Sequence, residues 1–382
     1  MSRITRLLIL SLLPSVLASV ALAAPEWTIE KVDRAASGNR MVQLNISKNG
    51  DKHLVYTGCS DGPCARSELF YSVLAGRSDW QKTSVDASTD DTGTGWFPSI
   101  AFDAKSIAHI FYADHEAQTL RYATNKDSKW KTQDLGSGRG GWWTSSAAAN
   151  GKVYFAHTKL PEQGWENAAL EVGTLENDKW TLEVVDGARN AGWFTSMAVL
   201  PNGNPVVSYN AVFSQPTGAI KVAIKGANNW DIVDIDNTSV KHHVAVDSAG
   251  NIHLVYQKVS SGQAAKSAFS LVHVTNASGT WKRTNLQEVG DEGVNNTGYF
   301  PRITTDASGG LHIAYTTIKD QMIYARKLNA NTNWEYYSFD DLGGTYYPWI
   351  EVEPSGMVSI AYERSGNIYL ATCSNCSSRG KP

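Results

Sequence analysis

Cationic and titratable side chains occupy positions of this sequence where its similar segments carry aromatic or small residues. The segment 241–243 reads Lys-His-His where the segment 97–99 reads Phe-Pro-Ser, and Arg302 stands where the latter ends in serine. An arginine can neutralise the carboxylate of a uronic acid, which lowers the pKa of the adjacent C–H group. A histidine or tyrosine can then remove that proton, and another can protonate the leaving oxygen. These residue types predict lyase chemistry on chains that contain uronic acid.

Each residue has an expected role in this hypothesis. Arg302 would neutralise the carboxylate, His243 or His242 would act as the base, and Tyr299 or Tyr346 would act as the acid. Further residues are predicted to bind the substrate: Lys241, Trp349, Arg40, Arg364, Trp96, Trp142 and Trp193. The aromatic residues of this set have an alternative interpretation, in which they fill the gaps between repeats and bind nothing.

An internal repeat determines where these residues must lie. Seven tryptophans recur at intervals of 50 to 53 residues, each followed by a strand-like segment: Trp27, Trp80, Trp130, Trp180, Trp230, Trp281 and Trp334. Each full period contains four short β-like runs bounded by turn residues. A fixed period of this size with four strands predicts an all-β fold, a seven-bladed β-propeller with four antiparallel strands per blade.

The two ends of the repeat array complement each other. An isolated fourth strand over 27–33 precedes the first repeat, and the last repeat stops near Thr372 after three strands. Joining them would complete a blade and remove an exposed sheet edge, so we expect the N-terminal strand to join the last blade. The sequence therefore predicts one propeller over 24–372 and a C-terminal tail over 373–382.

The first 23 residues are typical of a secretory signal peptide. Arg3 and Arg6 precede a short apolar run from Leu7 to Val20, and Ala21-Leu22-Ala23 provides a small-residue cleavage site. The run is short for a membrane span, and Pro14 interrupts it. We therefore expect a secreted or periplasmic protein with no membrane span.

The four cysteines suit an oxidising compartment. Cys59 and Cys64 flank a turn-forming tetrapeptide, and Cys373 and Cys376 form a CxxC near the C-terminus. We expect a local disulfide within each pair.

The repeats resemble those of secreted bacterial propellers of the sialidase-like (BNR-repeat) superfamily. The resemblance rests on the strand pair 98–112, which is echoed at 243–256 and 301–315, and on the tryptophan-led fourth strand. It covers nearly the whole chain after residue 23, and it implies a fold without specifying a reaction.

Composition and motifs exclude several classes of function. The 34 basic and 37 acidic side chains leave a net charge of −3, which offers no general attraction to nucleic acid. Four histidines recur at one position of the second strand and are expected to be structural: His53, His109, His253 and His312. Because the sequence has no phosphate-binding glycine loop and no metal-ligand spacing, we expect no cofactor and no metal.

The sequence thus predicts a protein that binds polysaccharide or another glycan at the mouth of the central channel. A polysaccharide lyase is slightly favoured. Two alternatives without catalysis stay open, namely a lectin and a protein-interaction scaffold at the cell surface.

Overall fold

The fold consists of β-strands. The computed structural model describes residues 24–36, 41–59, 66–76, 79–87, 93–115, 117–214, 217–259, 269–287, 299–317, 319–340 and 343–377. Over these ranges the backbone forms 27 strands and no helix, so the predicted all-β class is confirmed. A search of the same residues finds no helix suited to crossing a membrane. The predicted signal peptide and Arg40 lie outside the described residues.

Neighbouring strands pair antiparallel into five sheets of four strands and one sheet of seven. Three four-stranded sheets come from the first half of the chain: β2 (Val42–Ile46), β3 (Lys52–Gly58), β4 (Glu68–Leu74) and β5 (Gln81–Ala87); β6 (Thr94–Phe102), β7 (Ala108–Asp114), β8 (Thr119–Thr124) and β9 (Lys131–Arg139); β10 (Trp142–Ala149), β11 (Lys152–Lys159), β12 (Ala169–Glu176) and β13 (Lys179–Asp186).

The second half supplies the other sheets. The seven-stranded sheet contains β14 (Trp193–Val199), β15 (Pro205–Ser214), β16 (Thr217–Lys225), β17 (Trp230–Val246), β18 (Ile252–Val259), β19 (Phe269–Thr275) and β20 (Lys282–Gln287). The remaining two contain β21 (Tyr299–Thr305), β22 (Leu311–Thr316), β23 (Met322–Lys327) and β24 (Glu335–Asp340); and β25 (Thr345–Val352), β26 (Val358–Arg364), β27 (Asn367–Cys373) and β1 (Trp27–Arg34).

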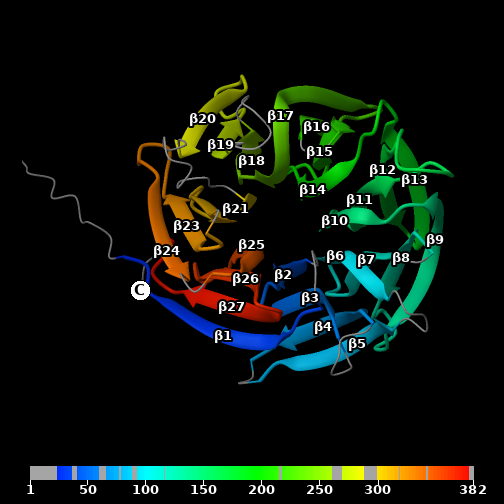
Figure 1. Cartoon of the computed structure of the whole chain (residues 1–382), viewed down its shortest axis with the longest axis horizontal. Helices are drawn as coiled ribbons and strands as arrows, with labels where there is room; N and C mark the ends of the chain where they lie inside the picture. Colours follow the sequence, from blue (N-terminus) through cyan, green and yellow to red (C-terminus); the bar gives the residue numbers. More distant parts are fainter. Residues whose placement is uncertain are drawn as a thin grey trace, which may run out of the picture.

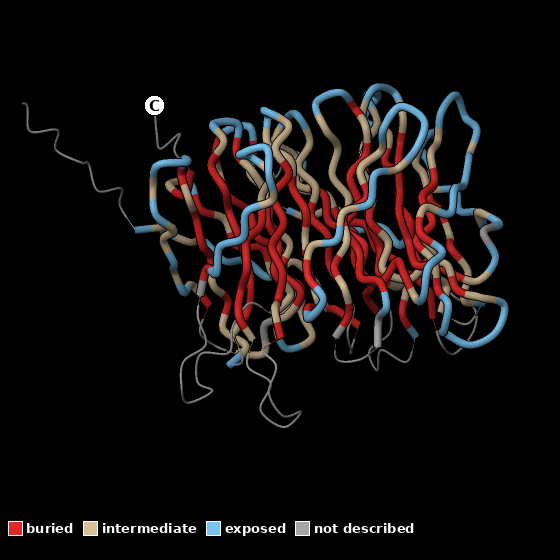
Figure 2. The backbone as a smooth tube through the Cα atoms, turned by 90° about the horizontal axis from the view of Figure 1, so that it is seen from above, coloured by how far each residue is buried: buried red, intermediate tan, exposed pale blue. Residues whose placement is uncertain are grey.

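The sheets stand around a common axis, and the first strand of each four-strand unit lies nearest to it (Figure 1). The long strand β17 pairs with β16 through its first part and with β18 through its second, which joins two units into the seven-stranded sheet. At the ends of the chain, β1 pairs antiparallel with β27, with Trp27 opposite Cys373. Figure 2 shows buried backbone through the middle of the molecule and exposed turns on both faces.

The repeat tryptophans pack where two neighbouring units meet. Trp130, for example, packs on a cluster that joins Val55 and Leu69 of one sheet to Ile110 and Tyr112 of the next. Burial of apolar surface stabilises a fold by about 25 cal/mol per Å². The regular tryptophan spacing is therefore explained by packing between units.

A tyrosine–aspartate hydrogen bond links neighbouring units on their outer side. In five units the tyrosine of the second strand donates to the aspartate that ends the last strand of the preceding unit: Tyr56 to Asp33, Tyr112 to Asp86, Tyr209 to Asp186, Tyr256 to Asp236 and Tyr362 to Asp340, at 2.5–2.9 Å. Hydrogen bonds to charged groups contribute about 1.5–3 kcal/mol each.

The recurring second-strand histidines are structural, as predicted. In three units the Nδ1 atom lies 2.7 Å from a tyrosine hydroxyl of the third strand: His53 with Tyr71, His109 with Tyr122 and His312 with Tyr324. His253 makes the equivalent contact with His273 at 3.2 Å.

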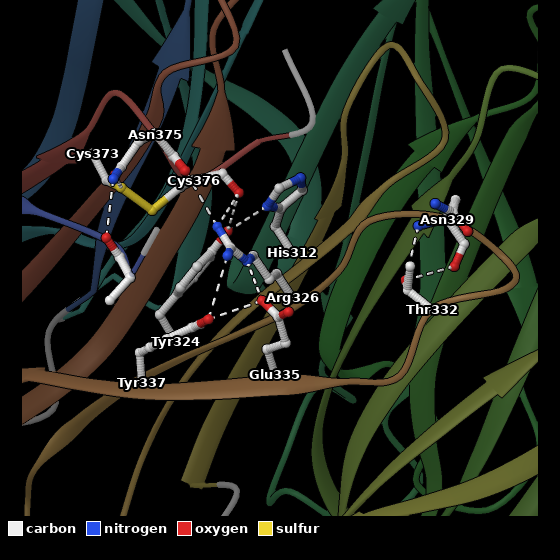
Figure 3. Close-up of polar contacts among 11 residues, drawn as sticks. His312, Tyr324, Arg326, Asn329, Thr332, Glu335, Tyr337, Cys373, Asn375 and Cys376 are labelled. Atoms are coloured by element: carbon white, nitrogen blue, oxygen red, sulfur yellow. Dashed lines mark hydrogen bonds and ion pairs between the residues drawn. A yellow bond between two sulfur atoms is a disulfide. The ribbon is translucent and has the colours of Figure 1, made fainter. Parts of the chain in front are cut away.

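A fully buried arginine fastens the C-terminal segment (Figure 3). Arg326 donates from Nε to Glu335 at 2.7 Å and from Nη1 to the carbonyl oxygens of Asn375 and Cys376, each at 3.2 Å. The predicted disulfide between Cys373 and Cys376 closes this segment. Cys59 is also disulfide-bonded, whereas Cys64 lies outside the described residues.

Candidate functional site

A repeated β-bulge shapes the centre of the molecule. In six innermost strands the pairing register shifts near the start of the strand, at a residue whose φ is positive. These residues, here called the bulge ring, are Phe97, Trp143, Phe194, Lys241, Phe300 and Tyr347, with φ between 48° and 55°. Large side chains rarely adopt this backbone conformation, so the surrounding structure must impose it.

The bulge ring brings side chains from different units into contact. The ring centroids of Trp143 lie 4.2 Å from Phe97 and 4.3 Å from Phe194, and Phe300 lies 4.2 Å from Tyr347. Inter-unit hydrogen bonds support the bulges, because Thr144 donates to the carbonyl oxygen of Phe97 at 2.6 Å. The six residues thus form one cluster across the ring of sheets.

Lys241 is the one cation of the bulge ring, and aromatic faces surround its amine. Its Nζ lies 4.2 Å from the ring centroid of Phe194, 4.8 Å from that of Phe300 and 5.0 Å from that of Trp143. Within the described residues it forms no ion pair. Desolvation by burial, with a smaller contribution from the nearby Arg302 charge, lowers the pKa of Lys241 to about 7.

Arg302 is a second cation with no carboxylate partner in the described part of the chain, and it is more deeply buried than Lys241. The residue is 9% exposed. Its Nη1 donates to the carbonyl oxygen of Pro301 at 3.1 Å, and its guanidinium carbon lies 5.3 Å from the ring centroid of Trp349. Its Nε is buried without a hydrogen-bond partner. Burial lowers the pKa of Arg302 to about 10, so the guanidinium keeps its charge at neutral pH.

Both neighbouring histidines are neutral. Desolvation is the largest cause, and the Arg302 charge adds to it, so the pKa of His242 falls to about 3 and that of His243 lies well below its usual value. The Nδ1 atom of His242 lies 2.9 Å from the Ser208 hydroxyl.

His243 also links two units through the backbone. Its Nδ1 lies 3.1 Å from the carbonyl oxygen and 3.3 Å from the backbone nitrogen of Ile303. It accepts the Ile303 N–H in the tautomer with Nε2 protonated and donates to the carbonyl oxygen in the other tautomer. Gln43 and Ser196 stand at the same place in their own strands and accept the equivalent backbone N–H groups, from Ile100 and Val244. Part of the role of His243 is therefore structural.

These residues line one cavity at the centre of the ring of sheets. The central cavity is narrow: about 30 Å³ is open to water, within an envelope of about 530 Å³ that includes its opening to solvent. It is lined by bulge-ring members and by residues of the following layer, among them Lys241, His242, His243, Arg302 and Trp349. The structure thus brings together five of the predicted site residues in a positively charged cavity.

Other predicted residues do not line this cavity. Tyr299 packs edge-on to Phe269, and the hydroxyl of Tyr346 donates to Asp320 at 2.9 Å. Arg364 donates to Asp340 at 2.6 Å and stacks on Tyr369. Arg364 is held there because Asp340 supplies the carboxylate that a half-buried guanidinium requires.

The three predicted tryptophans form an arc of aromatic contacts over β6, β10 and β14. Trp96 and Trp142 have ring centroids 6.2 Å apart, and Trp193 lies 6.2 Å from Trp165, which itself lies 4.8 Å from Trp142. Trp142 and Trp193 pack on the buried residues Leu160 and Ala168. The packing interpretation therefore accounts for a part of this arc.

Two residues near the site were missed by the sequence reasoning. Trp165, in the loop between β11 and β12, is 41% exposed and extends the arc. Glu351 lines a second cavity, which Trp349 also lines. The Nε1 atom of Trp349 donates to the carboxylate of Glu351 at 3.0 Å, and burial raises the pKa of Glu351 to about 7. An alignment of the inner strands carries a signal for Glu351, because alanine stands at its position in four repeats.

Comparisons with known proteins support the architecture. No protein-family model matches the chain, and no curated protein matches its sequence. Among solved structures, an α-L-arabinanase of Penicillium chrysogenum in complex with arabinobiose is similar over 92% of this chain and 98% of its own, with a TM-score of 0.53 and 12% identity.

Two further solved structures are similar at the same level. A lectin mutant of Aleuria aurantia in complex with Fucα1-6GlcNAc is similar over 81% of this chain and 98% of its own, with a TM-score of 0.51 and 8% identity. A Hadza microbial sialidase is similar over 88% of this chain and 66% of its own, with a TM-score of 0.51 and 13% identity. At such low identity these likenesses establish the fold, which is that of a β-propeller.

Removal of the charge should affect the free energy of unfolding differently at the two buried arginines, Arg302 and Arg326. Arg302→Met should leave the free energy of unfolding unchanged or raise it by about 1 kcal/mol, because it removes a buried charge that has no carboxylate partner. Arg326→Met, the matched contrast, should lower it by about 3 kcal/mol, because it breaks a paired buried network. Denaturant unfolding of both variants measures this, and an equal loss in both would contradict the assignment of Arg302 to a binding site.

Anion binding in the central cavity should depend on pH. Lys241 is protonated below its pKa of about 7 and neutral above it, whereas Arg302 keeps its charge to about 10. The affinity for glucuronate, whose carboxylate is ionised throughout, should therefore fall as the pH rises through 7. Calorimetric titrations at a series of pH values test this, with Lys241→Met as the control in which the pH step should disappear. A step that persists in that variant would assign the titration to another group.

Proposed function

We propose that this protein binds an acidic glycan, with a carboxylate of the glycan held by Arg302 and Lys241 in the central cavity. The observation that carries the proposal is a pair of cations, the buried Arg302 and the partly buried Lys241, that share a cavity without a carboxylate partner among the described residues. Leaving a buried charge unpaired is costly, and the other deeply placed arginines, Arg326 and Arg364, are each paired with a carboxylate. A ligand carboxylate would supply the missing negative charge.

The cavity suits a carboxylate attached to a sugar ring. Arg302 offers N–H donors in the planar arrangement that matches the two oxygens of a carboxylate. Lys241 contributes a second charge from the aromatic side of the cavity, and Trp349 and Phe300 offer flat apolar surfaces for the ring carbons. The site therefore combines charge neutralisation with aromatic contact.

The solved structures that share the fold are consistent with this proposal. The lectin was solved with Fucα1-6GlcNAc and the arabinanase with arabinobiose, so the architecture holds glycans in those proteins. The acidic character of the proposed ligand rests on the cations Arg302 and Lys241 of this chain.

Lyase activity on uronic acid-containing chains is a second candidate function. It is favoured by the neutral imidazole of His243, a form that can accept a proton, in the same cavity as Arg302. Nε2 can accept this proton in the tautomer whose Nδ1 carries the hydrogen and donates it to the carbonyl oxygen of Ile303, 3.1 Å away. Its strongly lowered pKa makes the imidazole a weak base, and neither Tyr299 nor Tyr346, the predicted acids, lines the cavity. Binding without turnover, as in a lectin, therefore agrees better with the geometry.

The proposal includes a ring of seven blades, with β17 shared by two of them and β1 completing the last. The sheet order β1-β27-β26-β25 and the two-sided pairing of β17 support this count. Deletion of β1 should then lower the unfolding temperature, because it exposes the edge of β27.

We also propose that the protein is exported and that the propeller begins after residue 23. The disulfide between Cys373 and Cys376 agrees with an oxidising compartment. Mass spectrometry of the protein recovered from culture medium or periplasm should find Ala24 at the N-terminus. An intact chain that begins at Met1 would contradict export with cleavage.

The binding proposal predicts a requirement for the carboxylate and for Arg302. Uronic acid oligosaccharides should bind in calorimetric titrations, and the same oligosaccharides with their carboxyl groups reduced should not. Arg302→Met should weaken binding by about a hundredfold, the usual size of the loss when one partner of a buried charge pair is removed.

The matched control is Arg283→Met, which removes an arginine of β20 that pairs with Asp236 of β17 and should leave the affinity unchanged. Equal binding of the reduced oligosaccharides would refute the proposal. Ultraviolet absorbance of the same mixtures distinguishes the two candidate functions, because only a lyase generates C4–C5 unsaturation.

A further inference from the structure

The exposed indole of Trp165 is held in a defined place at the rim of the aromatic arc. Arg139, at the end of β9, donates from Nη1 to the carbonyl oxygen of Pro161 at 2.7 Å and to that of Gly164 at 3.1 Å. Its Nε donates to the side chain of Gln118 at 3.0 Å. This bracing fixes the loop on both sides of residues 162–163 and so positions the adjacent tryptophan.

Packing in the protein interior accounts for the positions of Trp142 and Trp193 but not for that of Trp165. Trp193 is buried, and Trp142 packs with it on Leu160 and Ala168. Trp165 touches Trp142 edge-on but lies outside that buried cluster, and 41% of it is exposed. A braced and exposed indole is preorganised for contact with a ligand, because little conformational entropy is lost on binding.

Aromatic contacts connect Trp165 to the central cavity. The ring centroid of Trp142 lies 4.8 Å from that of Trp165 and 5.2 Å from that of Phe97, which lies 4.2 Å from Trp143. Trp143 lines the central cavity. We call Trp165, Trp142, Phe97 and Trp143 the aromatic track, and it is a continuous path from the exposed Trp165 to the cavity that contains Lys241 and Arg302.

We propose that the outer end of the aromatic track, Trp165 with Trp142, is a second subsite that binds a neutral sugar ring of the same glycan. This inference rests on the acidic-glycan function proposed above. The C–H face of a pyranose is flat and apolar, and it suits stacking on an indole, whereas no cationic side chain contacts Trp165 in the described structure to attract a second carboxylate. The ligand class is therefore an oligosaccharide in which acidic and neutral residues both occur.

The experiment compares a short ligand with a long one. The probes are glucuronate and a tetrasaccharide in which glucuronic acid alternates with a neutral N-acetylhexosamine, both titrated calorimetrically. Trp165→Ala should weaken tetrasaccharide binding by about tenfold, the effect of losing one aromatic contact, and should leave glucuronate binding unchanged. Trp165→Phe should restore part of the affinity because it keeps a flat ring.

Val184→Ala is the control, since Val184 is an exposed apolar residue of β13 outside the aromatic track. Both variants are expected to keep the unfolding temperature of the unchanged protein, because each alters an exposed side chain. An unchanged tetrasaccharide affinity in Trp165→Ala would overturn the second subsite and leave the acidic-glycan function standing. Failure of the unchanged protein to bind either probe would overturn both.

Discussion

The left-handed backbone at the bulge ring is the constraint on which the centre of this molecule depends. A regular inner strand would alternate its side chains between the two faces of its own sheet. The bulge inserts an extra residue and brings Phe97, Trp143, Phe194 and their equivalents into contact with one another across different sheets. The six residues keep this rare conformation because each packs against its neighbours. Hydroxyl groups such as that of Thr144 also donate hydrogen bonds to the displaced carbonyl oxygens. The same bulge that joins the units also builds the wall of the cavity.

Charge burial gives this cavity its chemical character. The fold tolerates Arg326 because a carboxylate and two backbone carbonyls surround it (Figure 3). Arg302 is also buried, but no carboxylate of the described chain pairs with its charge. Lys241 is surrounded by aromatic faces. Proteins retain such departures from good internal pairing mainly where a function requires them. The contrast between the two arginines is therefore a physical reason to assign binding to the centre of the ring.

The inner strands carry different residues at one equivalent position, and these differences have two physical origins. The contacts of each side chain in the structure distinguish them. Gln43, Ser196 and His243 differ in chemistry, yet each accepts a backbone N–H from a neighbouring unit. Their side chains vary because several acceptors can serve one donor. Arg302 and Trp349 occupy equivalent positions but make no such link in the described structure, and they face each other at 5.3 Å. The departure from the repeat is thus structural at His243 and chemical at Arg302.

The sequence by itself determined the all-β class, the four-strand unit, the regular recurrence of the tryptophans and the structural role of the recurring histidines, because each depends on local periodicity and on packing that repeats between units. It also identified the cluster of Lys241, His242, His243, Arg302 and Trp349, since a cation is conspicuous where repeats carry apolar or small residues. Only the tertiary structure decided that Tyr299, Tyr346 and Arg364 turn to other partners, that the histidines are neutral and that Trp165 belongs to the arc. Those outcomes depend on which carboxylates, carbonyls and rings lie within a few ångströms in space. Arg364 and Asp340, for example, belong to two different sheets and come together where these sheets meet, which sequence spacing does not specify.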